Sequence, residues 1–254
     1  MYYLALLPFL VDSVFLTGRF AQSISTYTFR IGVKFSLPFY FPSLTNVYDF
    51  PARPGISTEL PVFGLAPIFG SASAILYTVI LAYVSAGYLG RLHSSITGTL
   101  STILDSANKY FLRILAYAAL WLGLTLVGVI IALANPLSAV LYVLLLIVVN
   151  YFLFLTPFAI VADNVSLTEG LRRSLNASGS LSSRTIPYVL LFGLVTIVVS
   201  VPVYLILNFG LLSFFAALAG FAFIGTVLVA STFCFYSNIA PQEMKTGSAV
   251  AEGQ

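Results

Sequence analysis

Side chains that could carry out chemistry are scarce in this sequence. It has one histidine, His93, and one cysteine, Cys234, and neither stands at a spacing typical of metal ligands. A disulfide within the chain and a haem held by two of its own histidines are therefore excluded. We interpret Cys234 as a small packing residue and His93 as a polar residue at a membrane edge. No phosphate-binding loop is present, so the sequence predicts neither a cofactor nor a nucleic-acid partner.

The densest group of charged side chains lies in VSLTEGLRRSLNAS, Val165–Ser178, within a chain of only 11 basic and 8 acidic residues. Glu169 follows Ser166 by three residues, which is the capping-box pattern of a helix start. Leucines then recur every four residues and predict one apolar stripe: Leu167, Leu171 and Leu175. Arg172 and Arg173 lie off this stripe, as in an amphipathic helix at a membrane surface. We interpret the stretch as a joint rather than a catalytic site.

One acidic residue, Asp12, falls inside an apolar run near the start of the sequence. An ionisable group at membrane depth costs several kcal/mol and indicates a functional site by default. The alternative is that this first run is short and that Asp12 lies near its aqueous end. Both interpretations are open on the sequence alone.

The composition predicts an all-α integral membrane protein with a single membrane domain, residues 1–254. The chain is 59% hydrophobic and 7% charged, whereas a soluble domain has about a quarter charged residues. A helix needs about 20 apolar residues to cross a bilayer, and six runs are predicted as spans: 2–16, 62–89, 111–134, 137–160, 186–212 and 214–239. The first lacks the basic start of a signal peptide, which favours a span over a cleaved leader.

Lysines and arginines in the connections predict the orientation of these spans. Seven of them fall on the side of the links after the second and fourth spans and of the C-terminal tail, 240–254: Arg91, Lys109, Arg113, Arg172, Arg173, Arg184 and Lys245. Four fall in the long opposite link, 17–61: Arg19, Arg30, Lys34 and Arg53. This places both termini in the cytoplasm of a prokaryote, under its plasma membrane. Contact with the membrane surface or a partner is predicted for Arg113, Arg172, Arg173 and Arg184.

Two inner surface helices are predicted, over about 95–110 and 166–176. A shift of 71 residues superimposes them without gaps, so that Ser95 meets Ser166 and Arg113 meets Arg184. The alignment predicts a parallel internal repeat, in which the two surface helices are related by a pseudo-twofold axis along the membrane normal.

The outer link contains TYTFRIGVKFS, Thr26–Ser36, in which apolar and polar residues alternate strictly. A period of two predicts a short β-strand that pairs within the link or with another protein's sheet edge. A helical stripe through Phe20, Ile24 and Tyr27 is the alternative. We expect partner contacts from five residues of this stretch: Tyr27, Phe29, Arg30, Lys34 and Phe35.

The segment TPFAIVADNVSLTEGLRRSLNASGS, Thr156–Ser180, resembles the cytoplasmic link of a broad group of six-span bacterial and archaeal membrane proteins. The group includes the membrane domain attached to glycerophosphodiester phosphodiesterases. The likeness rests on Gly170-Leu171-Arg172-Arg173-Ser174 and on the layout of the spans. It implies a six-span fold, and these 254 residues contain no phosphodiesterase catalytic domain, so it implies no such activity.

These patterns favour a non-enzymatic membrane protein that acts as a subunit or scaffold, since no series of ionisable side chains crosses the spans. Its expected partners are the lipid bilayer and other membrane subunits, or further copies of itself. The alternative is a transporter component, because Pro157 and Pro202 lie inside predicted spans and prolines there can mark broken helices at a substrate site. An intramembrane enzyme is the weakest hypothesis, for lack of an acid–base or nucleophile pair.

Overall fold

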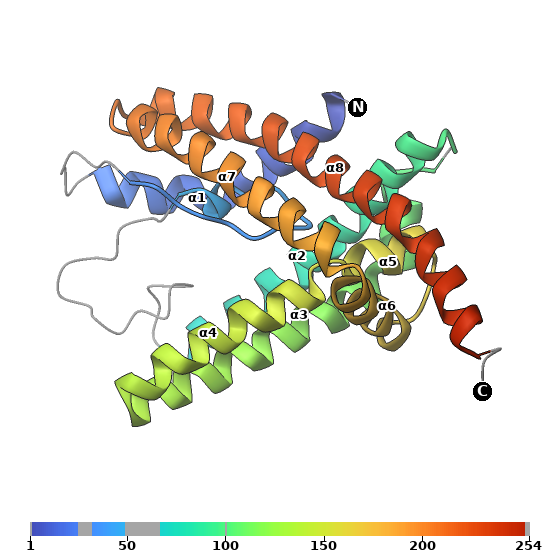
Figure 1. Cartoon of the computed structure of the whole chain (residues 1–254). Coiled ribbons are helices and arrows are strands. Elements are labelled where there is room, and N and C mark those ends of the chain that lie inside the picture. The colour runs from blue at the N-terminus through green and yellow to red at the C-terminus, as the bar shows by residue number, and fades with distance from the viewer. Residues whose placement is uncertain (1, 25–31, 49–66, 100, 252–254) are drawn as a thin grey trace. The chain divides into compact units, whose positions relative to one another are not determined.

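The computed structural model describes residues 2–24, 32–48, 67–99 and 101–251, which are helical except for the segment 32–48 and short connections (Figure 1). The helices are η1 Tyr2–Ala5, α1 Leu6–Ile24, η2 Leu44–Asn46, α2 Pro67–Thr97, α3 Ile103–Ala134, α4 Pro136–Leu153, α5 Thr156–Ala162, α6 Leu167–Ser180, α7 Ser182–Leu207 and α8 Leu211–Ala251, where η1 and η2 are short 3-10 turns. The chain divides into two compact units. The first unit is Met1–Leu81 with Leu191–Val229, and the second unit is Ala82–Leu190 with Ala230–Gln254.

Five helical stretches of the described chain are long and apolar enough to cross a membrane: Ile75–Thr97, Ile103–Ile131, Val140–Ala162, Ser182–Leu207 and Leu211–Ile239. At 1.5 Å per residue each exceeds the ~30 Å of a bilayer core. The apolar helix Tyr3–Thr17 is shorter. The predicted helical class is therefore confirmed for the described residues, which include five helices that could span a membrane and one shorter apolar helix.

The inner surface helix predicted over 95–110 is wrong. Ser95 lies in the last turn of α2 and its hydroxyl donates back to the Arg91 carbonyl, 2.9 Å away. Gly98 then adopts a φ of +74°, a conformation that commonly ends a helix because glycine has no Cβ to clash. A new helix starts at Thr102, whose side chain accepts from the Asp105 N–H at 3.1 Å. It continues without a break to Ala134. The first copy of the predicted repeat therefore has no separate surface helix.

The strand predicted over 26–36 is also wrong where it can be compared with the structure. Residues 25–31 lie outside the described chain, and residues 32–36 are neither strand nor helix. The alternation nevertheless has a structural counterpart. Val33 and Phe35 are exposed, whereas the side chains of Lys34 and Ser36 donate to the backbone oxygens of Thr45 and Asn46. Apolar side chains thus point outward and polar ones inward.

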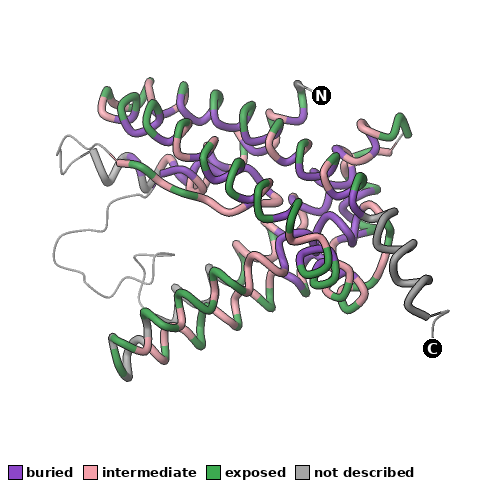
Figure 2. The backbone as a smooth tube through the Cα atoms, in the orientation of Figure 1, coloured by how far each residue is buried: buried purple, intermediate pink, exposed green. Residues whose placement is uncertain are grey.

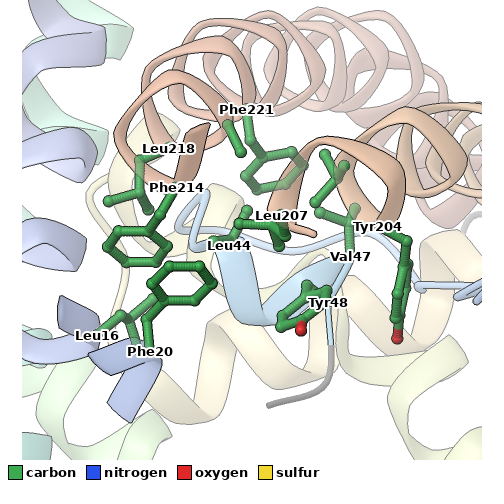
Figure 3. Close-up of a cluster of buried hydrophobic side chains, with 12 residues drawn as sticks. Leu16, Phe20, Leu44, Val47, Tyr48, Tyr204, Leu207, Phe214, Leu218 and Phe221 are labelled. Carbon is green, nitrogen blue, oxygen red and sulfur yellow. The ribbon is translucent and has the colours of Figure 1, made fainter. Parts of the chain in front are cut away.

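The first unit has an aromatic core that joins α1, the loop around η2, α7 and α8 (Figure 3). The rings of Phe20 and Phe214 stack at 4.3 Å between centroids, and Tyr48 packs on Tyr204 at 4.7 Å. Leu44 is fully buried among them. The non-helical segment 32–48 is therefore part of the core of this unit.

In the second unit α3 and α4 form an antiparallel pair that turns at Asn135 (Figure 1). The Asn135 side chain accepts from the Leu137 N–H at 2.9 Å, and Pro136 follows at the first helical position, a favourable helix start. Tyr142 packs over Gly128, where a Cβ would lie 2.6 Å from its ring, and donates to the Leu124 carbonyl. Figure 2 shows the pair mostly half-buried or exposed along its length.

Candidate functional site

The charged stretch of the sequence forms a compact junction between α5 and α6 in the second unit. The span that begins in α4 breaks after Leu153, and Pro157 lies in the first turn of α5. After α5, Asn164 adopts a φ of +54°, which reverses the chain. Ser166 then caps α6 by accepting from the Glu169 N–H at 3.4 Å. The helix start inferred from Ser166 and Glu169 coincides with this cap.

The packed face of α6 is made of small residues rather than leucines. Its buried positions are Gly170, Ser174, Ala177 and Ser178. The Ser174 hydroxyl donates to the Phe152 carbonyl at 2.7 Å. These serines satisfy carbonyls at the end of α4, which the break in that helix leaves without helical partners.

Gly170 lowers the helix propensity of α6, and the close approach of α5 explains why a glycine lies at this position. A Cβ at Gly170 would lie 3.0 Å from Cγ1 of Ile160 and 3.5 Å from the Thr156 carbonyl oxygen. In the sequence, the packed face of α6 is indicated by small residues spaced four apart at positions 170, 174 and 178. This spacing is typical of closely packed membrane helices. The leucine stripe lies elsewhere, and Leu175 is exposed.

Arg173 is the centre of an ion-pair network at this junction. Its Nη1 lies 2.5 Å from Oδ2 of Asp163 and its Nε lies 3.0 Å from Oε1 of Glu169. Tyr236 of α8 donates to the same Asp163 oxygen at 2.5 Å. Burial opposes the charge of Arg173, but the hydrogen bonds that it donates to Glu169 and Asp163 outweigh this effect and raise the pKa of the guanidinium above its ordinary value. Arg173 therefore stays charged and links three segments of the chain.

The other basic residues singled out in the sequence have different positions. Arg172 is 75% exposed and lies 3.8 Å from Glu169, a separation at which an exposed pair contributes little. Arg113 of α3 reaches the α5–α6 turn, where Nη1 donates to Oδ1 of Asn164 at 3.0 Å and to the Val165 carbonyl at 3.1 Å. Arg184 lies exposed at the start of α7.

This junction binds its own chain. Arg173 pairs with both Asp163 and Glu169, and Arg113 holds the turn between α5 and α6. Among the residues that the structure describes, no three His, Cys, Asp or Glu side chains gather as metal ligands. The arrangement can position α6 against α3, α5 and α8, which is a mechanical role.

A second polar cluster lies in the first unit around Asp12. The Asp12 side chain is 4% exposed. Its Oδ1 accepts from the Ser43 hydroxyl at 2.9 Å and its Oδ2 from the Leu44 N–H at 2.6 Å. The carboxylate thereby supplies partners to the first turn of η2, whose N–H groups have none within the turn.

Lys34 joins the same loop from the other side. Its Nζ donates to the Thr45 carbonyl at 2.6 Å, and the Thr45 hydroxyl lies 3.0 Å from that of Ser43. Asp12 and Lys34 thus both contact the loop around η2, although they lie far apart in the sequence. Phe35 lies against α7, and a Cβ at Gly193 would lie 1.9 Å from its ring. Tyr27, Phe29 and Arg30 lie outside the described residues.

Comparison with family models, with curated proteins and with solved structures finds no match to this chain. The resemblance of Thr156–Ser180 to the link of six-span prokaryotic proteins therefore stays a prediction.

Proposed function

We propose that this chain is a non-enzymatic, six-span subunit or scaffold of a membrane complex in the plasma membrane of a prokaryote, with both termini in the cytoplasm. Its partner-binding surface is the α3–α4 pair. The observation that carries the proposal is the exposure of α3, to which the exposed apolar residues of α4 add. Only 11% of the α3 span is buried, against 39% to 44% of the other four spans.

The exposed side chains of α4 surround much of the helix. Large apolar residues are exposed at neighbouring positions along it: Leu137, Val140, Leu141, Val143, Leu144, Leu145, Ile147 and Val148. Helices in a bilayer associate through close van der Waals packing, and α4 uses only its Tyr142 side for α3. The last turns of α4 pack on α6, and the remaining sides of residues 137–148 offer an uncharged apolar surface to a second membrane helix.

The charged groups support a scaffold in a different way. Asp12, Arg113, Asp163 and Arg173 all hold segments of this chain together, and a residue committed to such contacts is poorly placed to bind and release a substrate. The outward side of α6, with Arg172 and Leu175 exposed, fits the lipid headgroup region or a cytoplasmic partner.

Site-specific photo-crosslinking tests the proposed surface in cells. A photoreactive residue at Leu141 or Leu144 is expected to give a discrete adduct of higher mass. The same residue at Leu190, which is equally exposed on α7, is the matched control and should give none. If neither α4 position forms an adduct, lipid alone covers the pair and the scaffold proposal is wrong.

A transporter component is the second candidate, favoured by the break between α4 and α5. The span Val140–Ala162 is interrupted there, and interrupted spans form the substrate sites of many transporters. Beside the break, the Thr156 hydroxyl is buried and has no hydrogen-bond partner in the described structure. A substrate that raises the melting temperature of the purified chain, and loses this effect with Thr156→Val, would support transport.

A further inference from the structure

Residues 32–48, which lie between α1 and α2, run along α7 away from Tyr204 and then back to it. Gly32 lies against Tyr204, where a Cβ would be 2.6 Å from its ring. Further along, Phe39 packs on Phe192 at 5.2 Å between ring centroids. At the end of the segment Tyr48 packs on Tyr204 again, at 4.7 Å. The two ends of the segment thus meet the same residue of α7, while its middle lies three helical turns away.

Two hydrogen bonds fix the first part of the segment in register with the helix. The Lys34 N–H donates to the Ser200 hydroxyl and the Ser36 N–H to the Thr196 hydroxyl, both at 3.0 Å. Two residues of extended chain cover about 6.6 Å and one turn of four helical residues covers about 6 Å. Each hydroxyl also donates to a carbonyl of its own helix. Span side chains thereby provide partners for N–H groups that a non-helical segment cannot satisfy internally.

The turn of the segment lies at the middle of two spans. Phe35 packs on Gly193, which is the twelfth of 26 residues in the α7 span, and Pro42 packs on Gly225, the fifteenth of 29 in the α8 span. Both contacts are so close that a Cβ would lie 1.9 Å and 2.4 Å from the respective ring atoms. From Tyr204 to Gly193, α7 rises about 16 Å, half of a ~30 Å bilayer core.

We propose that residues 32–48 form a re-entrant membrane segment, which enters the bilayer and returns to the same face with its turn near the bilayer centre. Val33 and Phe35 contact lipid acyl chains there. The directions of the side chains support contact with lipid. Val33 and Phe35 are 60% and 49% exposed, whereas the side chains of Lys34 and Ser36 point toward the protein. An aqueous link would show the opposite pattern. Non-helical backbone at membrane depth is tolerated where protein buries it, and Phe41–Leu44 are buried.

This inference deepens the proposed membrane function, because it rests on α7 and α8 crossing the bilayer. In this proposal Asp12 and Lys34 have a structural role. They hold the returning part of the segment through Leu44 and Thr45. The stretch predicted as an outer binding link is then largely a membrane element.

Nitroxide accessibility measures the depth directly. Cys234→Ser removes the native thiol, and a nitroxide is attached at Phe35→Cys or Val33→Cys in the purified chain in phospholipid liposomes. Val198, exposed in the same part of α7, is the deep control, and Phe209, exposed in the turn between α7 and α8, is the shallow control. Val33 is included because its side chain packs less closely than that of Phe35.

We expect the ratio of oxygen to nickel-chelate collisions at Phe35 to match that at Val198 and to exceed that at Phe209 several-fold. A nickel-accessible Phe35 beside a deep Val198 would show an aqueous link and overturn the re-entrant segment alone. Low accessibility to both reagents would show protein cover and overturn the lipid contact. A nickel-accessible Val198 would overturn the membrane assignment of α7 and the proposed function with it.

Discussion

At the residue scale, the Asp12 carboxylate stabilises the fold by accepting two hydrogen bonds inside the first unit. In Asp12→Asn the amide oxygen can replace only one of these acceptors, and the amide NH₂ faces a donor. We expect the free energy of unfolding to fall by about 1–3 kcal/mol, measured by denaturant titration in detergent. Ser13→Ala is the control, because that hydroxyl donates only to the Phe9 carbonyl of its own helix. Equal stability of the two variants would contradict this role.

The two adjacent arginines of α6 should differ in their effect on stability. Arg173→Ala removes the partner of Asp163 and Glu169, and we expect a loss of about 1–2 kcal/mol, since charged hydrogen bonds are stronger than neutral ones. Arg172→Ala should change stability by less than about 0.5 kcal/mol, because an exposed pair contributes little. Thermal unfolding followed by near-UV circular dichroism compares them. A larger effect of Arg172→Ala would mean that membrane or partner contacts dominate.

Sequence reasoning could find these residues but not their partners. The helix start at Ser166 follows from local spacing, and the structure has its cap there. The hydrogen bond from Tyr236 to Asp163 joins residues 73 positions apart, and no local pattern in a single sequence indicates it. Asp12 was recognisable as unusual because it interrupts an apolar run, whereas Ser43 and Leu44, which bind it, carry no signal of their own.

At the element scale, two glycines test how closely segment 32–48 packs on α7. Gly193→Ala would place a methyl group 1.9 Å from the Phe35 ring, while Gly220→Ala in α8 meets nothing within 4 Å. We expect Gly193→Ala to displace the segment and destabilise the fold by about 1–3 kcal/mol. The control should be neutral or stabilising, by up to about 1 kcal/mol. Limited proteolysis of the segment, together with thermal unfolding, measures both effects.

The docking of α6 allows a similar matched test. Gly170→Leu fills the close contact with Ile160, whereas Gly179→Leu in the same helix meets nothing within 4 Å. Both substitutions improve helix propensity, so a difference between them reports packing. We expect only Gly170→Leu to lower the melting temperature and to increase hydrogen exchange across α6. Equal behaviour would show that the small-residue face is not required.

The sequence predicted the buried face of α3 better than the residue at which this helix begins. Ile103, Ala107, Tyr110 and Ile114 follow a helical period in the sequence, and the last three are buried in α3. The start of that helix was misplaced because Ser95 matches Ser166 at a shift of 71 residues. Gly98 and the Thr102–Asp105 pair were the stronger local signals, since one ends α2 and the other begins α3.

At the scale of the whole molecule, burial distinguishes spans that composition treats alike. The five long spans were recognisable from apolar length, because a bilayer sets that length. Their burial was not recognisable, since a lipid-facing leucine and a core leucine are identical in sequence. The α3 span is at least as apolar as the α2 and α4 spans that flank it and is the least buried of the five, so the proposed partner surface could be found only from the structure.

The number of crossings gives a final prediction about the two ends of the chain. The five long spans alone would place the start of α2 and the end of α8 on opposite sides. If α1, which has 19 residues and a length of about 28 Å, also crosses, the N-terminal residues and the end of α8 lie on the same side. The re-entrant segment leaves this count unchanged, because it returns to the face from which it enters.

Reporter fusions can decide between five and six crossings in cells. Green fluorescent protein at either end should fluoresce, because both ends are predicted to be cytoplasmic by the excess of Lys and Arg on that side. Alkaline phosphatase inserted in the α7–α8 turn at Gly210 should be active, and the same insertion at Gly98 should be inactive. An N-terminal fusion that reports the outer side, with the other three results unchanged, would show that α1 does not cross, and Asp12 would then lie in an element packed on the spans rather than in one of them.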